Sequence, residues 1–146
     1  MDYSSWIIDH RLWLIDNSLL IIARGYLDMP WEHYSKLRVW QKAMDLTDLV
    51  YTITVKLPRE ERFGLYSQMR RAANSIPSNI AEGHGRRTNR DTLQFLSIAR
   101  GSAFELETQL LICQRQRLLP QDQIELALQL CAEVSRMLSS FILKLS

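Results

Sequence analysis

The sequence predicts an all-α protein, an antiparallel up-down four-helix bundle. Three observations lead to this fold class. Apolar residues recur at steps of three and four along four long segments, the connections between these segments are short, and no segment alternates apolar and polar residues as a β-strand does. Long amphipathic helices joined by short loops pack as such a bundle. The 146 residues have the length of one ordinary domain.

The first predicted helix begins near Tyr34 and ends before Pro58. Leu37, Trp40 and Tyr51 lie along its apolar stripe at helical spacing. Proline disfavours the helical conformation in the residue before it, so Pro58 is expected to stop this helix.

The second predicted helix starts near Arg59-Glu60-Glu61, where the carboxylates suit a helix N-terminus. It runs through Ile80 and carries Pro77 in its interior. A proline there removes one backbone hydrogen bond and costs about 3 kcal/mol or more, so we predict a kink. Gly83 is predicted to close this helix as a C-cap.

The third predicted helix is capped by Thr88 or Asn89, both of which are good N-cap residues. It extends to about Leu118. The fourth helix opens at Pro120 and continues to the end of the chain, with one apolar face along its length.

Polar and small residues inside the second and third helices suggest a structural motif. Ser75, Ser78 and Asn79 can hydrogen-bond the carbonyl groups that the proline frees. We expect a buried polar network across the bundle that fixes the register of the helices, with Asn79 and Glu82 facing Ser102 and Glu105. Gly101 and Ala103 would allow close helix approach. The residues assigned to this motif are Ser75, Pro77, Ser78, Asn79, Glu82, Gly83, Gly101, Ser102 and Glu105.

Residues 1–28 stand apart from the bundle, which we assign to residues 34–146. Trp6-Ile7-Ile8-Asp9-His10-Arg11-Leu12 is followed by Trp13-Leu14-Ile15-Asp16-Asn17-Ser18-Leu19, a repeat of seven residues. One interpretation is an amphipathic helix that packs on a partner. A second is a signal or membrane segment, although charged residues interrupt every apolar run. The third is a translated tandem DNA repeat ahead of a natural start at Met29, which makes these residues a weakly ordered extension.

The composition bounds the function. A net charge of +2 excludes a uniformly polybasic nucleic-acid binder. Cys113 and Cys131 fall on apolar helical faces and make no disulfide framework, which indicates the reducing cytoplasm. We expect no catalytic residues, no cofactor and no metal site, because His84 has no converging ligands and Glu105 and Glu107 point to different faces of one helix. An enzyme is therefore not expected.

Arginines are concentrated between residues 70 and 100, and the acidic residues in this segment are Glu82 and Asp91. Guanidinium groups bind phosphate bidentately, and several on one surface give a salt-sensitive, sequence-independent grip on nucleic acid. The alternative is a solvated charged face, with Arg70 or Arg71 paired to Glu60, Glu61 or a neighbouring subunit. The candidate nucleic-acid-binding residues are Arg70, Arg71, Arg86, Arg87, Arg90 and Arg100.

Several motifs occur in a characteristic order. They are Leu37-x-x-Trp40-Gln41-Lys42-Ala43, Leu57-Pro58-x-Glu60, Gln68-x-Arg70-Arg71-Ala72-Ala73, Ser75-Ile76-Pro77-Ser78-Asn79-Ile80-Ala81-Glu82-Gly83 and Gly101-Ser102-x-x-Glu105-Leu106-Glu107. Over about residues 34–145, the chain resembles the bacterial four-helix-bundle proteins encoded in intervening sequences of 23S ribosomal RNA genes. It is also similar to the accessory variability determinant proteins of diversity-generating retroelements.

The resemblance implies a small cytoplasmic bundle that assembles as a ring-shaped homopentamer, away from membranes. In the retroelement relatives, such a ring binds nucleic acid and the reverse transcriptase as a non-enzymatic accessory. We therefore predict an oligomeric accessory protein that binds RNA or DNA. The alternative is a structural or protein-interaction bundle with an apolar partner surface. The chain departs from the family in residues 1–28, and in His84, where an aromatic residue is expected.

Overall fold

The computed structural model describes residues 33–146, which form one compact unit. The long helices are α2 (Arg38–Thr54), α3 (Leu65–His84), α4 (Asn89–Arg115) and α5 (Gln121–Leu145). Two short 3₁₀ helices, η2 (Tyr34–Lys36) and η3 (Arg59–Glu61), precede α2 and α3. Residues 33–146 contain no β-strand, so the predicted all-α four-helix bundle is confirmed. The predictions for residues 1–28 lie outside the described residues.

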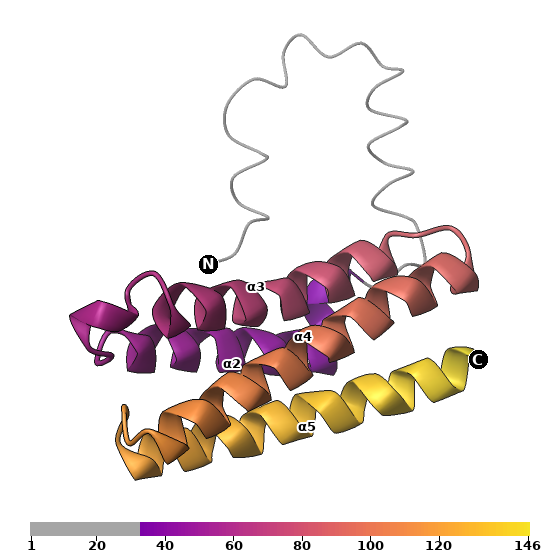
Figure 1. Ribbon diagram of the computed structural model, residues 1–146. Coiled ribbons are helices and arrows are strands. Elements are labelled where there is room, and N and C mark those ends of the chain that lie inside the picture. The colour runs from indigo at the N-terminus through magenta and orange to yellow at the C-terminus, as the bar shows by residue number, and fades with distance from the viewer. Residues whose placement is uncertain (1–32) are drawn as a thin grey trace, which may run out of the picture. The chain divides into compact units, whose positions relative to one another are not determined.

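The chain reverses direction at each connection, so that consecutive helices run antiparallel (Figure 1). α3 packs against α2 and α4, and α5 packs against α4 and α2, which closes the four helices around one core. As a result, the connection between α3 and α4, the start of α2 and the end of α5 lie toward the same end of the bundle (Figure 1).

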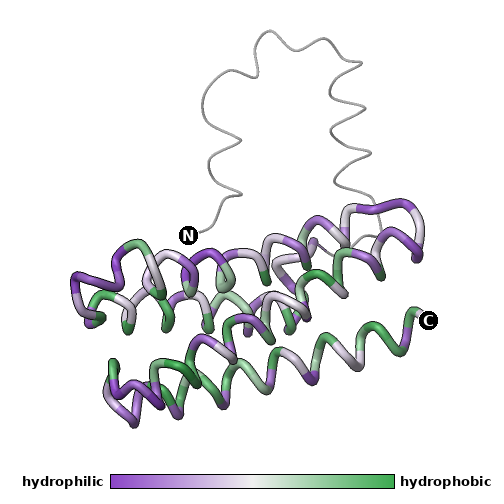
Figure 2. The backbone as a smooth tube through the Cα atoms, in the orientation of Figure 1, coloured by the Kyte–Doolittle hydropathy of each residue, from purple (hydrophilic) through white to green (hydrophobic). Residues whose placement is uncertain are grey.

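The apolar stripes of all four helices build the core. Its largest fully buried side chains include Leu46, Ile53, Met69, Ile76, Ile80, Leu96, Leu106, Leu110, Ile124 and Leu138. Figure 2 shows that α5 is rich in hydrophobic residues along its length. By length and composition alone, α5 could cross a membrane, since its most apolar window has a mean hydropathy of 1.4. Its buried side chains, however, belong to the bundle core, and the core helix of a bundle passes the same test.

The two cysteines pack as small apolar side chains, as predicted. Both are free and buried. Burial raises the pKa of the Cys113 thiol to about 11 and that of Cys131 to about 12. The Cys131 thiol donates to the Ala103 carbonyl oxygen at 3.2 Å, which ties α5 to α4. Neither thiol is therefore prone to form the reactive thiolate at neutral pH.

Two predicted boundaries of α3 are wrong. Arg59–Glu61 forms a separate 3₁₀ turn, and α3 begins at Leu65, whose backbone N–H donates to the Glu61 carboxylate at 3.2 Å. Gly83 does not end the helix, because it is buried inside α3 and the C-cap is Gly85. A Cβ atom on residue 83 would lie 3.0 Å from the Phe95 Cβ. Glycine at this position therefore permits the close approach of α3 to α4.

The other helix ends follow the sequence more closely. α2 ends at Thr54, ahead of Pro58, and α5 begins directly after Pro120. Of the two predicted caps of α4, Thr88 is the one used, because its hydroxyl accepts the backbone N–H of Asp91 at 3.2 Å.

Pro77 is buried in the interior of α3, and the helix continues through it. A proline has no N–H to donate, so the carbonyl of Ala73, four residues earlier, loses its helical partner. Thr47 of α2 takes over this role. Its hydroxyl lies 3.1 Å from the Ala73 carbonyl oxygen and 2.8 Å from that of Ala43. The kink predicted at Pro77 stays a prediction.

The polar residues next to Pro77 bond other carbonyl groups. The Ser78 hydroxyl donates to the Asn74 carbonyl oxygen at 2.7 Å, and the Asn79 amide donates to that of Ser75 at 2.7 Å. The prediction that these side chains satisfy the carbonyl freed by the proline is therefore wrong for Ala73. The partner comes from another helix.

Candidate nucleic-acid interface

The arginine cluster predicted from the sequence centres on the connection between α3 and α4. Arg86 and Arg87 lie in this connection, and Arg90 lies in the first turn of α4. All three side chains are exposed. The Thr88 cap fixes where α4 starts, so it also fixes where Arg90 projects from the helix.

Arg86 is already held by its own chain. Its guanidinium pairs with the Glu82 carboxylate one turn earlier in α3. The guanidinium carbon also lies 4.4 Å from the centre of the Phe95 ring, at a cation–π distance. Within residues 33–146, Arg87 and Arg90 make no ion pair. Their guanidinium groups therefore offer their donors to a ligand.

Arg70 stabilises the contact between α2 and α3. Its Nε donates to the Thr54 hydroxyl at 2.9 Å and its Nη2 donates to the Tyr51 carbonyl oxygen at 3.1 Å. The guanidinium carbon lies 4.2 Å from the ring centres of both Tyr51 and Tyr66. Because these contacts tie the end of α2 to α3, they favour the structural interpretation of Arg70 over phosphate binding.

Arg71 and Arg100 lie apart from the loop cluster. Arg71 pairs with Glu105 of α4 at 3.5 Å, so the predicted pairing with Glu60 or Glu61 is wrong. Arg100 stands ten residues after Arg90 on α4, about 15 Å along the helix axis. The six arginines are therefore spread along the bundle, and Arg86, Arg87 and Arg90 are the three that lie together at the connection between α3 and α4.

The polar network between α3 and α4 is smaller than expected. The Ser75 and Ser102 hydroxyls lie 2.8 Å apart, and the Asn79 amide donates to the Ser75 hydroxyl at 3.0 Å. These partly buried groups connect the two helices, as predicted. Glu82 and Glu105 stay outside the network, because their carboxylates are exposed and pair with arginines.

The outer face of α4 carries an apolar stripe that the sequence analysis missed. Ile98, Phe104, Leu111 and Ile112 are each between 42% and 51% exposed, although such side chains are usually buried. Their spacing places them on one broad side of the helix, opposite its buried face. Gly101 lies among them and is exposed. A Cβ there would meet nothing within 4 Å, so the predicted role of Gly101 in packing within this chain is wrong.

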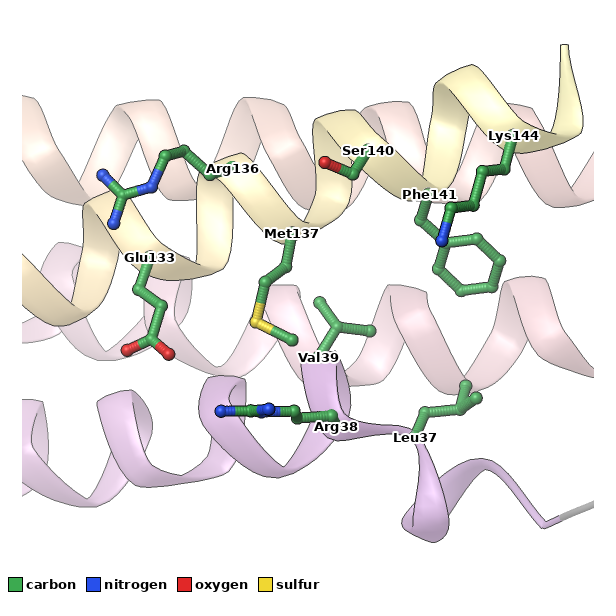
Figure 3. A pocket seen from close by; sticks show the side chains of 9 residues that line it. All are labelled: Leu37, Arg38, Val39, Glu133, Arg136, Met137, Ser140, Phe141 and Lys144. Carbon is green, nitrogen blue, oxygen red and sulfur yellow. The ribbon is translucent and has the colours of Figure 1, made fainter.

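A groove of about 450 Å³ between the start of α2 and the second half of α5 was also missed (Figure 3). Met137 and Phe141 point from α5 toward Leu37, the N-cap of α2, and toward Val39 in its first turn, and form the apolar floor of the groove (Figure 3). Basic side chains from both helices line it as well. The spacing of Arg136, Ser140 and Lys144, four residues apart, was the sequence signal for this surface.

Within residues 33–146, no three His, Cys, Asp or Glu side chains lie close enough together to hold a metal ion. The expectation of no catalytic residues, cofactor or metal stays a prediction.

Comparison with known proteins gives the chain its relatives. Residues 35–140 match the family described as the 23S rRNA-intervening sequence protein. A solved protein of unknown function, from the S23 ribosomal protein family of Bacteroides thetaiotaomicron VPI-5482, shares 25% sequence identity with this chain. The two structures agree with a TM-score of 0.65 over 71% of this chain and 97% of that one. No curated protein sequence matches the chain.

Proposed function

This chain belongs to the family of 23S rRNA-intervening sequence proteins, and from that premise we propose that it is a non-enzymatic accessory protein that binds nucleic acid. The observation that carries the proposal is the state of Arg87 and Arg90. Both side chains are exposed at the start of α4, and neither makes an ion pair within residues 33–146. Free guanidinium groups are the side chains that hold phosphate most effectively.

The location of these arginines supports the same function. The first turn of a helix leaves backbone N–H groups unpaired and has a partial positive charge, which favours an anion. Arg90 lies in that turn of α4, which also carries the Asp91 carboxylate, and Arg87 lies just before its cap. Structured RNA is the first ligand to test, with DNA as the second. We place this activity in the cytoplasm, where the buried free thiols stay reduced.

The test is a binding titration with a labelled structured RNA at low salt, followed by fluorescence anisotropy. The double variant R87A/R90A should weaken binding by roughly tenfold or more, because charge-assisted hydrogen bonds are lost. R59A/R115A removes two exposed arginines from the opposite end of the bundle and is the matched control, expected to bind as the wild type does. If the wild type binds neither RNA nor DNA at low salt, the proposal fails.

A second candidate function, a protein-interaction bundle, is favoured by the apolar stripe on α4. Exposed apolar patches of this kind mark protein interaction sites. We propose that another copy of the chain covers the stripe, within the homopentamer that the family resemblance implies. Gly101 fits this role, since its missing side chain leaves room for a neighbouring backbone.

Light scattering after gel filtration tests the assembly. The wild type should have the mass of five chains, and F104D/I112D should be monomeric, because the carboxylates would be buried in the interface. F63D changes a side chain that is 89% exposed on the connection between α2 and α3, and should leave the pentamer intact. A monomeric wild type would exclude the assembly without excluding RNA binding.

The resemblance to accessory variability determinants also makes a reverse transcriptase the protein partner to test. A retroelement reverse transcriptase that co-elutes with the wild-type chain on gel filtration, in the absence of nucleic acid, would support this part of the proposal. Co-elution that disappears after nuclease treatment would assign the contact to nucleic acid instead, and the protein contact would fail.

A further inference from the structure

The groove between α2 and α5 combines an apolar floor with basic walls. Arg38 stands at the start of α2, and Arg136 and Lys144 stand on α5, about 12 Å apart along that helix. Both helices therefore contribute positive charge to the groove. Each belongs to a helix held in place by the bundle core, so the groove is built on rigid elements.

The residues that line the groove leave it with a net positive charge, because three are basic and one is acidic. Glu133 is the one acidic residue in its lining, and the Glu133 carboxylate pairs with Lys42 at 3.5 Å. Within residues 33–146, Arg38, Arg136 and Lys144 make no ion pair. Three like charges around one groove repel each other, so a ligand with several negative charges would stabilise the arrangement.

The floor of the groove suits a flat apolar group. Leu37, Met137 and Phe141 are partly buried and pack against the core below them. Phe141 offers an aromatic ring beside Lys144, and Arg136 stands farther back along α5 (Figure 3). Proteins hold single-stranded nucleic acid with aromatic rings and basic side chains in one groove, because the bases stack while the phosphates bind the charges.

We propose that this groove binds an unpaired stretch of RNA, with phosphates at Arg38, Arg136 and Lys144 and a base against Phe141. The inference rests on the proposed function, since it names the form of nucleic acid that a second site on the bundle takes. An acidic amphipathic peptide is the competing occupant. RNA is favoured because the start of α2 and the end of α5, which line the groove, lie toward the same end of the bundle as the arginine loop (Figure 1). One RNA with a structured part and an unpaired part could contact both surfaces.

The test compares a labelled 12-nucleotide oligo(U) with an RNA duplex of the same length. In the full chain, R136A/K144A should weaken oligo(U) binding at least tenfold and duplex binding less than twofold. F141L keeps an apolar side chain but removes the ring, and should weaken oligo(U) binding at least fivefold. R59A/R115A, with the same change in charge, should leave oligo(U) binding unchanged. Circular dichroism should show the wild-type helix content for every variant.

The outcomes separate this inference from the proposed function. If structured RNA binds and depends on Arg87 and Arg90, but oligo(U) binding is absent or indifferent to R136A/K144A, the groove inference fails and the proposed function stands. If no nucleic acid binds at all, both fail. If a Glu- and Leu-rich amphipathic peptide binds the groove and oligo(U) does not displace it, the groove is a protein site and the inference is overturned.

Discussion

At Pro77, the hydrogen bond that a proline cannot donate is replaced by a side chain from another helix. The Thr47 hydroxyl of α2 lies 3.1 Å from the Ala73 carbonyl oxygen of α3, in a buried position. A buried carbonyl without a donor costs about 1–3 kcal/mol. Thr47 therefore offsets part of the cost of a proline inside a helix and, at the same time, joins two helices of the bundle.

Removal of this hydroxyl should destabilise the chain. We expect T47V to lower the free energy of unfolding by about 1–3 kcal/mol, whereas T47S, which keeps the hydroxyl, should lower it less. Urea denaturation followed by circular dichroism measures both changes.

The dependence on Pro77 gives the decisive control. In a P77A background, the amide of residue 77 can bond the Ala73 carbonyl, so T47V should cost at least about 0.5 kcal/mol less there than in the wild type. An equal cost in both backgrounds would show that the Thr47 hydroxyl serves only the Ala43 carbonyl of its own helix.

The sequence predicts the break at Pro77 but not its repair. Proline chemistry identifies the gap, and nearby polar residues are the obvious donors. Thr47 precedes Ala73 by 26 residues, and only the packing of α2 on α3 brings it there. The same limit applies to Arg70 and Arg86, since contacts with Tyr66 and Phe95 depend on side-chain positions that a linear pattern does not contain.

At the scale of elements, the contact between α3 and α4 depends on Gly83. A Cβ there would lie 3.0 Å from the Phe95 Cβ and 3.3 Å from the Thr92 carbonyl oxygen, both tighter than ordinary contact. The Thr92 hydroxyl donates to the Gly83 carbonyl oxygen at 3.0 Å. The two helices thus pack tightly just before the loop that carries the arginines.

A methyl group at this contact should push the helices apart. We expect G83A to destabilise the chain by about 1–3 kcal/mol, as other cases of overpacking do. G85A is the matched control, because a Cβ there meets its nearest neighbour at 3.6 Å; its effect should stay within about 0.5 kcal/mol. Thermal or urea unfolding compares the two variants, and equal effects would show that the close approach at Gly83 is not required.

The number and type of the helices could be predicted because each helix repeats its apolar positions over many residues. The boundaries of α3 could not, because they depend on single contacts. The Glu61 carboxylate, which lies before α3, accepts the backbone N–H of Leu65 at the start of the helix. Gly83 looks like a C-cap in the sequence, but it is buried inside α3. The α4 stripe and the groove were missed because apolar residues on a predicted helix are assigned to the core by default.

At the scale of the whole molecule, the basic side chains differ in whether they contact other residues of their own chain. Arg70, Arg71 and Arg86 are held by their own chain, whereas Arg87, Arg90 and the groove residues have no ion pair within residues 33–146. The net charge of +2 does not reveal this difference. Arg87, Arg90 and the groove residues lie toward the end of the bundle where α3 meets α4, and this end is the surface expected to face phosphates.

The most direct test of this account is the salt dependence of RNA binding. Each neutralised phosphate contributes about −0.7 to −0.9 to the slope of log K against log salt concentration. The wild type should show a steep negative slope, and R87A/R90A should reduce its magnitude by about 1.4–1.8, whereas R59A/R115A should leave it unchanged. A flat slope for the wild type, or one that R87A/R90A does not alter, would contradict the claim that these arginines hold nucleic acid.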